Sequence, residues 1–83
     1  MTVERFIAVY DKEDDSLLED IKIALSTLDL LAILDIDKAD DPDVYKSYAI
    51  TEAQFNKLKP VVAELQQFEF SKVHMKLECF SIE

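Results

Sequence analysis

A run of aspartates interrupted by one proline does most to limit how this chain can fold. Five aspartates fall within the nine residues 35–43. Pro42 disfavours helical backbone at Asp41, and so many carboxylates would repel one another inside a core. The sequence therefore predicts a solvated loop over residues 35–43. The core must come from the segments on either side of it.

The net charge of −9 is confined to two acidic blocks. Residues 11–20 hold six acidic side chains against Lys12, and residues 35–43 hold five against Lys38, so the rest of the 83-residue chain is neutral. Charge gathered in blocks creates a local field that can steer a basic partner. The same sign argues against binding to nucleic acids or anionic membranes. On charge alone, solvated loops and a surface for a cationic partner both remain open.

Composition narrows the class of protein. Apolar residues make up 49% of the chain, which suffices for the core of one small domain over residues 1–83. No apolar run approaches the ~20 residues of a membrane span, and the first residues lack the pattern of a signal peptide. Cys79 is the single cysteine, so we expect no internal disulfide and a cytoplasmic location. The absence of glycine excludes glycine-rich phosphate loops.

The first half of the chain reads as a strand followed by helix. Residues 3–10 carry apolar side chains on both faces, which predicts a central strand, and residues 11–15 form a turn. Ser16 and Glu19 have capping-box spacing, and apolar residues recur at intervals of three and four up to Leu28, which predicts a helix. Beyond Ser26 this helix either continues to residue 36 or breaks, with a second short helix from Asp29. Aspartates at a helix C-terminus are unfavourable, so the break is preferred.

The second half predicts a short strand, a helix and a final strand. Residues 46–50 are the candidate short strand. Thr51 and Gln54 form a second capping box, and Ile50 and Phe55 occupy the positions of a hydrophobic staple. The apolar stripe continues past Pro60, so this helix is expected to bend there rather than stop. Residues 73–82 alternate as a half-exposed strand. The expected fold is α+β, with a small sheet of about three strands and two or three helices packed on it.

The residues with catalytic or metal-binding chemistry do not form a recognisable site. His74 is the only histidine and falls on the polar side of the last strand. The serines therefore have no second histidine with which to form a catalytic triad. Cys79 falls on the apolar side, where cysteine acts as a small hydrophobe. Asp35 and Asp37 resemble the start of a calcium loop, but Ala39, Asp40 and Lys46 break the pattern. We expect neither an enzyme nor a cofactor or dedicated metal site.

Two tyrosines follow the acidic loop. Tyr45 and Tyr48 are either residues at the edge of the core or anchors of an interface, where tyrosine is enriched. Together with the loop they give the pattern Asp-Asp-Pro-x-x-Tyr-x-x-Tyr over residues 40–48. This segment, between a first strand and helix and a capped helix and final strand, resembles the immunity proteins of contact-dependent growth inhibition and related polymorphic toxin systems. The resemblance implies a small cytoplasmic protein that binds and blocks a delivered toxin, often a basic nuclease.

The leading hypothesis is an immunity protein that occludes the cationic active site of a nuclease toxin, for example a tRNase, as a monomer in a 1:1 complex. Asp41 is also a candidate for bracing the turn before Pro42. The alternative is an acidic adaptor, similar to secretion chaperones, which usually dimerise through an apolar surface. The expected footprint is Asp35, Asp37, Asp40, Asp41, Asp43 and Tyr45, with a secondary patch at Asp11, Glu13 and Asp14.

Overall fold

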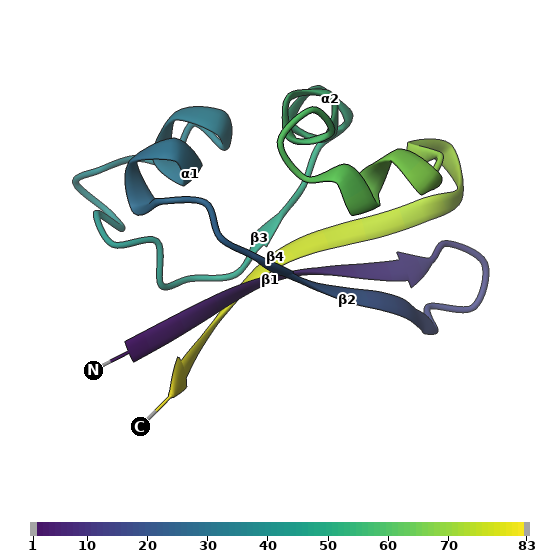
Figure 1. Ribbon diagram of the computed structural model, residues 1–83, viewed down its shortest axis with the longest axis horizontal. Coiled ribbons are helices and arrows are strands. Elements are labelled where there is room, and N and C mark those ends of the chain that lie inside the picture. The colour runs from purple at the N-terminus through teal and green to yellow at the C-terminus, as the bar shows by residue number, and fades with distance from the viewer. Residues whose placement is uncertain (1, 83) are drawn as a thin grey trace.

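A four-stranded antiparallel sheet forms one layer of the protein (Figure 1). The computed structural model describes residues 2–82, and the strand order in the sheet is β2-β1-β4-β3. The strands are β1 (Thr2–Asp11), β2 (Leu17–Ile23), β3 (Tyr48–Ala49) and β4 (Val73–Ile82). The long strands β1 and β4 pair along their whole length at the centre. This confirms the α+β class, with one strand more than expected.

The helical segments all lie on one face of the sheet (Figure 1). They are α1 (Thr27–Ile33), α2 (Glu52–Leu58) and the 3-10 turns η1 (Ala63–Gln67) and η2 (Phe70–Lys72). The core lies between the two layers. Alternate residues of β1 and β4 supply its floor, and the helices contribute leucines and Phe55 from above. The fully buried side chains include Ile7, Val9, Leu30, Leu58, Leu65, Met75 and Leu77.

The segment after the first turn is a strand, so the predicted helix from Ser16 is wrong. The turn itself is present, and the Asp11 N–H donates to the Ser16 carbonyl across it at 2.8 Å. Ser16 Oγ donates to Asp14 Oδ1 at 2.7 Å instead of capping a helix. Ile21 and Ile23 alternate with polar residues and pair with β1. Covering the apolar edge of β1 outweighs the helical spacing of the leucines, because local propensity is a weak prior.

The second short helix is confirmed as α1, although it follows a strand instead of a first helix and begins at Thr27, with Ser26 as its N-cap. The Ser26 Oγ accepts a hydrogen bond from the Asp29 N–H at 3.1 Å. The helix α1 then ends just before Asp35. A carboxylate thus lies at the helix C-terminus, an arrangement that the helix dipole makes unfavourable. The Ile36 N–H bonds the Leu31 carbonyl at 3.2 Å, and Asp35 has a left-handed φ of 53°. This is a Schellman-type end, which compensates for the carboxylate there.

The capping box at Thr51 is confirmed, but the bend at Pro60 is not. Gln54 and Thr51 exchange both hydrogen bonds of the box. The helix α2 ends at Leu58 with Lys59 as its C-cap, and Pro60 lies in the turn beyond it. Proline has no N–H to continue the helical ladder, so the chain turns and resumes as η1. Val62 and Leu65 still reach the core, as the apolar stripe predicted.

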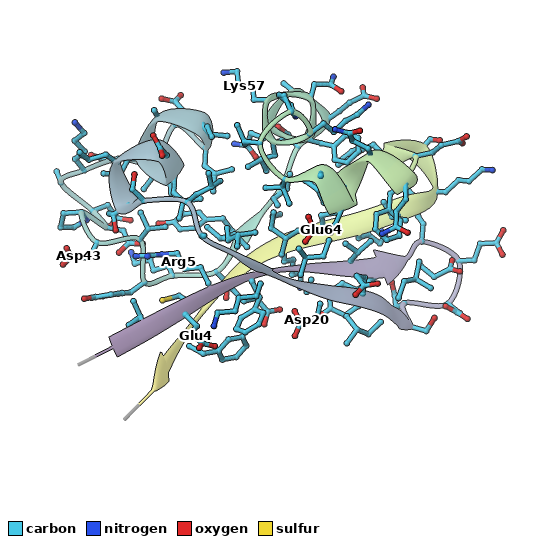
Figure 2. The ribbon with its side chains drawn as sticks, in the orientation of Figure 1. Glu4, Arg5, Asp20, Asp43, Lys57 and Glu64 are labelled. Carbon is cyan, nitrogen blue, oxygen red and sulfur yellow. The ribbon has the colours of Figure 1, made fainter. Side chains whose placement is uncertain are left out.

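The second face of the sheet carries no helix (Figure 1). Glu4 and Asp20 project from it, on the side opposite Lys57 and Glu64 (Figure 2). The rings of Phe6 and Phe80 meet edge to face with their centroids 5.5 Å apart. The central strand β1 is thus covered by helices on one side and partly by its own neighbours' side chains on the other.

Candidate partner-binding surface

The acidic segment 35–47 is a loop that connects α1 to β3, so the loop predicted over residues 35–43 is confirmed. The strand expected over residues 46–50 is reduced to Tyr48–Ala49. The loop lies at one end of the sheet, beside the start of β1 (Figure 1). Asp37 stabilises the first turn, where its Oδ1 accepts from the Ala39 N–H at 2.9 Å and its carbonyl accepts from the Asp41 N–H at 3.0 Å. The loop therefore has a defined course, although most of its side chains are exposed.

Asp41 fixes the second half of the loop from inside. Its side chain is 5% exposed and accepts hydrogen bonds from the backbone N–H groups of Tyr45 and Lys46, at 3.0 and 3.1 Å. The Tyr48 hydroxyl donates to Asp41 Oδ2 at 2.6 Å. This hydrogen bond, with help from the two backbone donors, lowers the pKa of the Asp41 carboxyl. Burial and the hydrogen bond to Asp41 together raise the pKa of Tyr48 to about 12.

Val44 and Arg5 complete this internal bracing. Val44 has a φ of 54°, which is rare for a β-branched residue, and its side chain is fully buried. Burying this valine stabilises the unfavourable backbone of the loop. From β1, Arg5 Nη2 donates to the Asp43 carbonyl at 2.6 Å and to Thr27 Oγ1 at 3.1 Å. Arg5 and Asp43 lie side by side at this end of the molecule (Figure 2).

The bracing leaves four carboxylates and one aromatic ring on the outside. Asp35, Asp37, Asp40 and Asp43 are exposed, and Tyr45 is 55% exposed. Lys46 Nζ pairs with Asp40 at 2.8 Å, and this contact raises the pKa of the lysine. The structure corrects the expected footprint in one respect. Asp41 is buried and its carboxylate accepts hydrogen bonds within the loop, so it is not part of the exposed surface and instead braces the turn, the other role that the sequence suggested for it.

The secondary patch lies at the other end of the sheet. Asp11 ends β1, and Glu13 and Asp14 follow in the β1–β2 turn. The loop lies beside Arg5, about 20 Å away along β1 at ~3.3 Å per residue. Figure 1 shows the turn and the loop at opposite sides of the molecule. Within the turn, Asp11 and Asp14 accept backbone hydrogen bonds, and the Ser16 hydroxyl lowers the pKa of Asp14. The secondary patch at Asp11, Glu13 and Asp14 is therefore separate from the acidic loop.

Of the chemically reactive residues, His74 pairs with Tyr10 far from the loop, whereas Cys79 pairs with Arg5 at the loop's end of the sheet. His74 is exposed on β4, on the face without helices, as expected. Cys79 is on the helix side of β4 as expected, but it is only partly buried and its thiol is free. Across the described residues, no group of three or more histidine, cysteine or acidic side chains could hold a metal ion. In the part of the chain that the structure covers, no helix is long and apolar enough to cross a membrane.

Two features of this surface were missed from sequence. Arg5 sits among the apolar residues Val3, Ile7 and Val9 on one side of β1, and a charged residue in such a row signals a specific partner. The conformation of Val44 left no sequence signal, because valine disfavours it. Both features depend on contacts between segments that are distant in the chain.

The fold and surface together define a small α+β domain, one helical layer on a four-stranded antiparallel sheet, with an internally braced acidic loop. The chain belongs to the family described as a domain of unknown function (DUF7683), whose model matches residues 4–78. The match includes Arg5, Asp41 and Tyr48, which hold the loop. No curated protein and no solved structure matches the chain.

Proposed function

We propose that this protein binds a cationic protein toxin and blocks it, as the immunity proteins that it resembles do. The observation that supports the proposal is that Asp41 organises the acidic loop from inside. One carboxylate is buried to fix the loop, and four other carboxylates and Tyr45 are exposed in the same loop. A loop that only kept the protein soluble would not require this internal order.

The chemistry of the surface suits a nuclease active site. Such a site presents lysine and arginine to phosphates, and outward carboxylates can occupy the same positions. Because the loop is ordered before binding, less conformational entropy is lost on association. Its charge also accelerates the encounter, up to ~10⁸ M⁻¹s⁻¹ or more at low salt. Tyr45, which is exposed in the same loop, supplies apolar area and a hydroxyl.

A second candidate function is an acidic adaptor that dimerises through an apolar surface. The observation that favours it is the Phe6–Phe80 pair on the face without helices, where Phe80 is 46% exposed. Analytical ultracentrifugation separates the two functions. A monomer at micromolar concentration supports the toxin inhibitor, and a stable dimer that Phe80→Ser dissociates supports the adaptor.

The direct test first establishes whether a neighbouring gene encodes a basic toxin domain and then titrates the protein against that purified domain. Asp40→Asn with Asp43→Asn removes two loop charges, and Glu64→Gln with Glu69→Gln is the matched control. Each pair includes one partner of an exposed ion pair, Asp40 with Lys46 and Glu69 with Lys72. We expect the loop variant to bind at least about tenfold more weakly, with a smaller loss at high salt. Equal affinities for wild type, loop variant and control would refute the loop as the binding surface.

A further inference from the structure

The strand β2 is an open edge of the sheet. It pairs with β1 on one side, and the strand order places it last in the sheet. At the opposite edge, β3 covers part of β4, next to the loop. β2 is seven residues long, contains no proline, and its regular part runs from Glu19 to Ile23. An uncovered strand of this length is a template for a further strand.

The pairing pattern shows which backbone groups of β2 are free. The Ile50 N–H bonds the Met75 carbonyl, so the backbone groups of Met75 point away from β1. Neighbouring residues of a strand point their groups to opposite sides, so even-numbered residues of β4 bond β1. By the same alternation, odd-numbered residues of β1 bond odd-numbered residues of β2. The N–H and C=O groups of Asp20 and Lys22 therefore face outward.

The surroundings of this edge are acidic. Glu19 and Asp20 are exposed on the two sides of the strand, and Lys22 is held by Glu4 at 2.8 Å, so it does not neutralise them. The acidic β1–β2 turn lies at one end of β2. At the other end, Ile23 pairs with Arg5, which bonds Asp43 of the loop. The edge thus runs from one acidic block to the other.

Apolar contacts are also available along this edge. Leu17 and Leu18 are 55% and 47% exposed at the irregular start of β2. Edge strands are often protected by bulges or by lysine. Here the bulge is confined to these two leucines, and the lysine is paired within the protein. Neither device protects the regular part of the strand.

We propose that β2 receives an extended basic segment of a partner protein as a fifth strand, with lysine or arginine side chains alternating with apolar ones. Backbone hydrogen bonds to Asp20 and Lys22 fix the segment, and Glu19, Asp20 and the turn select its charge. A second copy of the chain is a poorer occupant because each copy carries −9. Antiparallel pairing would also place the acidic turn of one copy beside the acidic loop end of the other. The proposal rests on the proposed function only in taking the partner to be cationic.

The first test uses two synthetic peptides, one alternating lysine and valine and the other alternating glutamate and valine. Amide hydrogen exchange of the wild-type protein is followed by NMR with each peptide. We expect the lysine peptide to slow exchange at the amides of Asp20 and Lys22, and the glutamate peptide to have no effect. The proposal is overturned if neither peptide slows exchange at Asp20 and Lys22, or if exchange slows only in the loop. Protection without peptide that rises with protein concentration assigns the edge to a second copy and overturns it as well.

A second test removes one outward donor while the pairing with β1 is kept. Asp20→Pro deletes an N–H that β1 does not use, and edge strands tolerate proline at such positions. Asp20→Asn is the matched control, because it removes the charge and keeps the N–H. We expect the proline variant to bind the lysine peptide about tenfold more weakly than the asparagine variant. The reason is that the peptide strand loses one backbone hydrogen bond and is displaced from the edge by the proline ring. If both variants are folded and bind the peptide equally well, the proposal is contradicted. If the proline variant does not fold, the exchange experiment with the wild-type protein is the deciding test.

The two proposals fail separately. If Asp20→Pro binds the toxin domain like wild type while Asp40→Asn with Asp43→Asn does not, the loop is the binding surface and the edge is not. If only the proline variant is weakened, the edge binds and the proposed role of the loop is refuted.

Discussion

Replacing Tyr48 with phenylalanine tests whether the buried Asp41 holds the loop. The change removes one hydroxyl, which donates to the Asp41 carboxylate at 2.6 Å, and keeps the ring in place. A hydrogen bond to a charged group contributes about 1.5–3 kcal/mol, and the partial exposure of Tyr48 reduces this, so we expect a loss of about 1–2 kcal/mol. Asp41→Asn should destabilise the protein further, because the amide nitrogen cannot accept from the loop's N–H groups.

The assay is thermal unfolding followed by circular dichroism, together with amide hydrogen exchange. Unfolding entropy scales with chain length, so 1–2 kcal/mol in an 83-residue chain lowers the midpoint by about 6–12 °C. In Tyr48→Phe the amides of Tyr45 and Lys46 should stay protected, since they bond Asp41 directly. In Asp41→Asn both amides should exchange faster. Tyr45→Phe is the control, and as a surface substitution it should change stability by less than about 0.5 kcal/mol.

Two outcomes would show that this reasoning is wrong. One is a Tyr48→Phe protein as stable as the control, which would mean that the hydroxyl is equally well solvated by water. The other is an Asp41→Asn protein whose loop amides keep their protection, because then the carboxylate does not organise the loop.

Three further predictions concern pH, the end of α1 and metal ions. The pKa of Tyr48 is raised from 10.0 to about 12, so its contribution to stability is complete below pH ~10 and lost as pH rises toward 12; absorbance titration should show a tyrosine with a pKa of about 12 that Tyr48→Phe removes. The pKa of Asp41 is lowered, so its contribution to folding stability is complete above its unfolded pKa of ~3.9. That contribution is lost as the pH falls below this value. Asp35→Gly should stabilise the protein by about 0.5 kcal/mol in urea unfolding, since glycine suits a φ of 53° and the change removes a carboxylate from a helix C-terminus; a less stable variant would mean that the aspartate makes a compensating contact. Micromolar calcium should leave the thermal midpoint unchanged, and a rise of several degrees would reveal a site that the loop geometry does not suggest.

The sequence by itself determined the elements whose signals are local. The capping box at Thr51 uses residues three positions apart, and the alternation in residues 73–82 reports directly on which side of β4 faces the core. Pro42 and its aspartates specified a loop because neither a helix nor a core accommodates them. These interactions lie within a few residues, so no knowledge of the rest of the fold was needed to infer them.

Only the tertiary structure decided the identity of β2 and the partners of Arg5. Leu17–Ile23 has leucines at helical spacing and isoleucines at strand spacing, and the exposed edge of β1 selects the second pattern. Arg5 lies in an apolar row of β1, and only the fold brings its guanidinium to Thr27 Oγ1 and to the Asp43 carbonyl, which are 22 and 38 positions away in the chain. In both cases the outcome depends on partners brought together by folding. The energy that distinguishes the alternatives is therefore not contained in the local sequence.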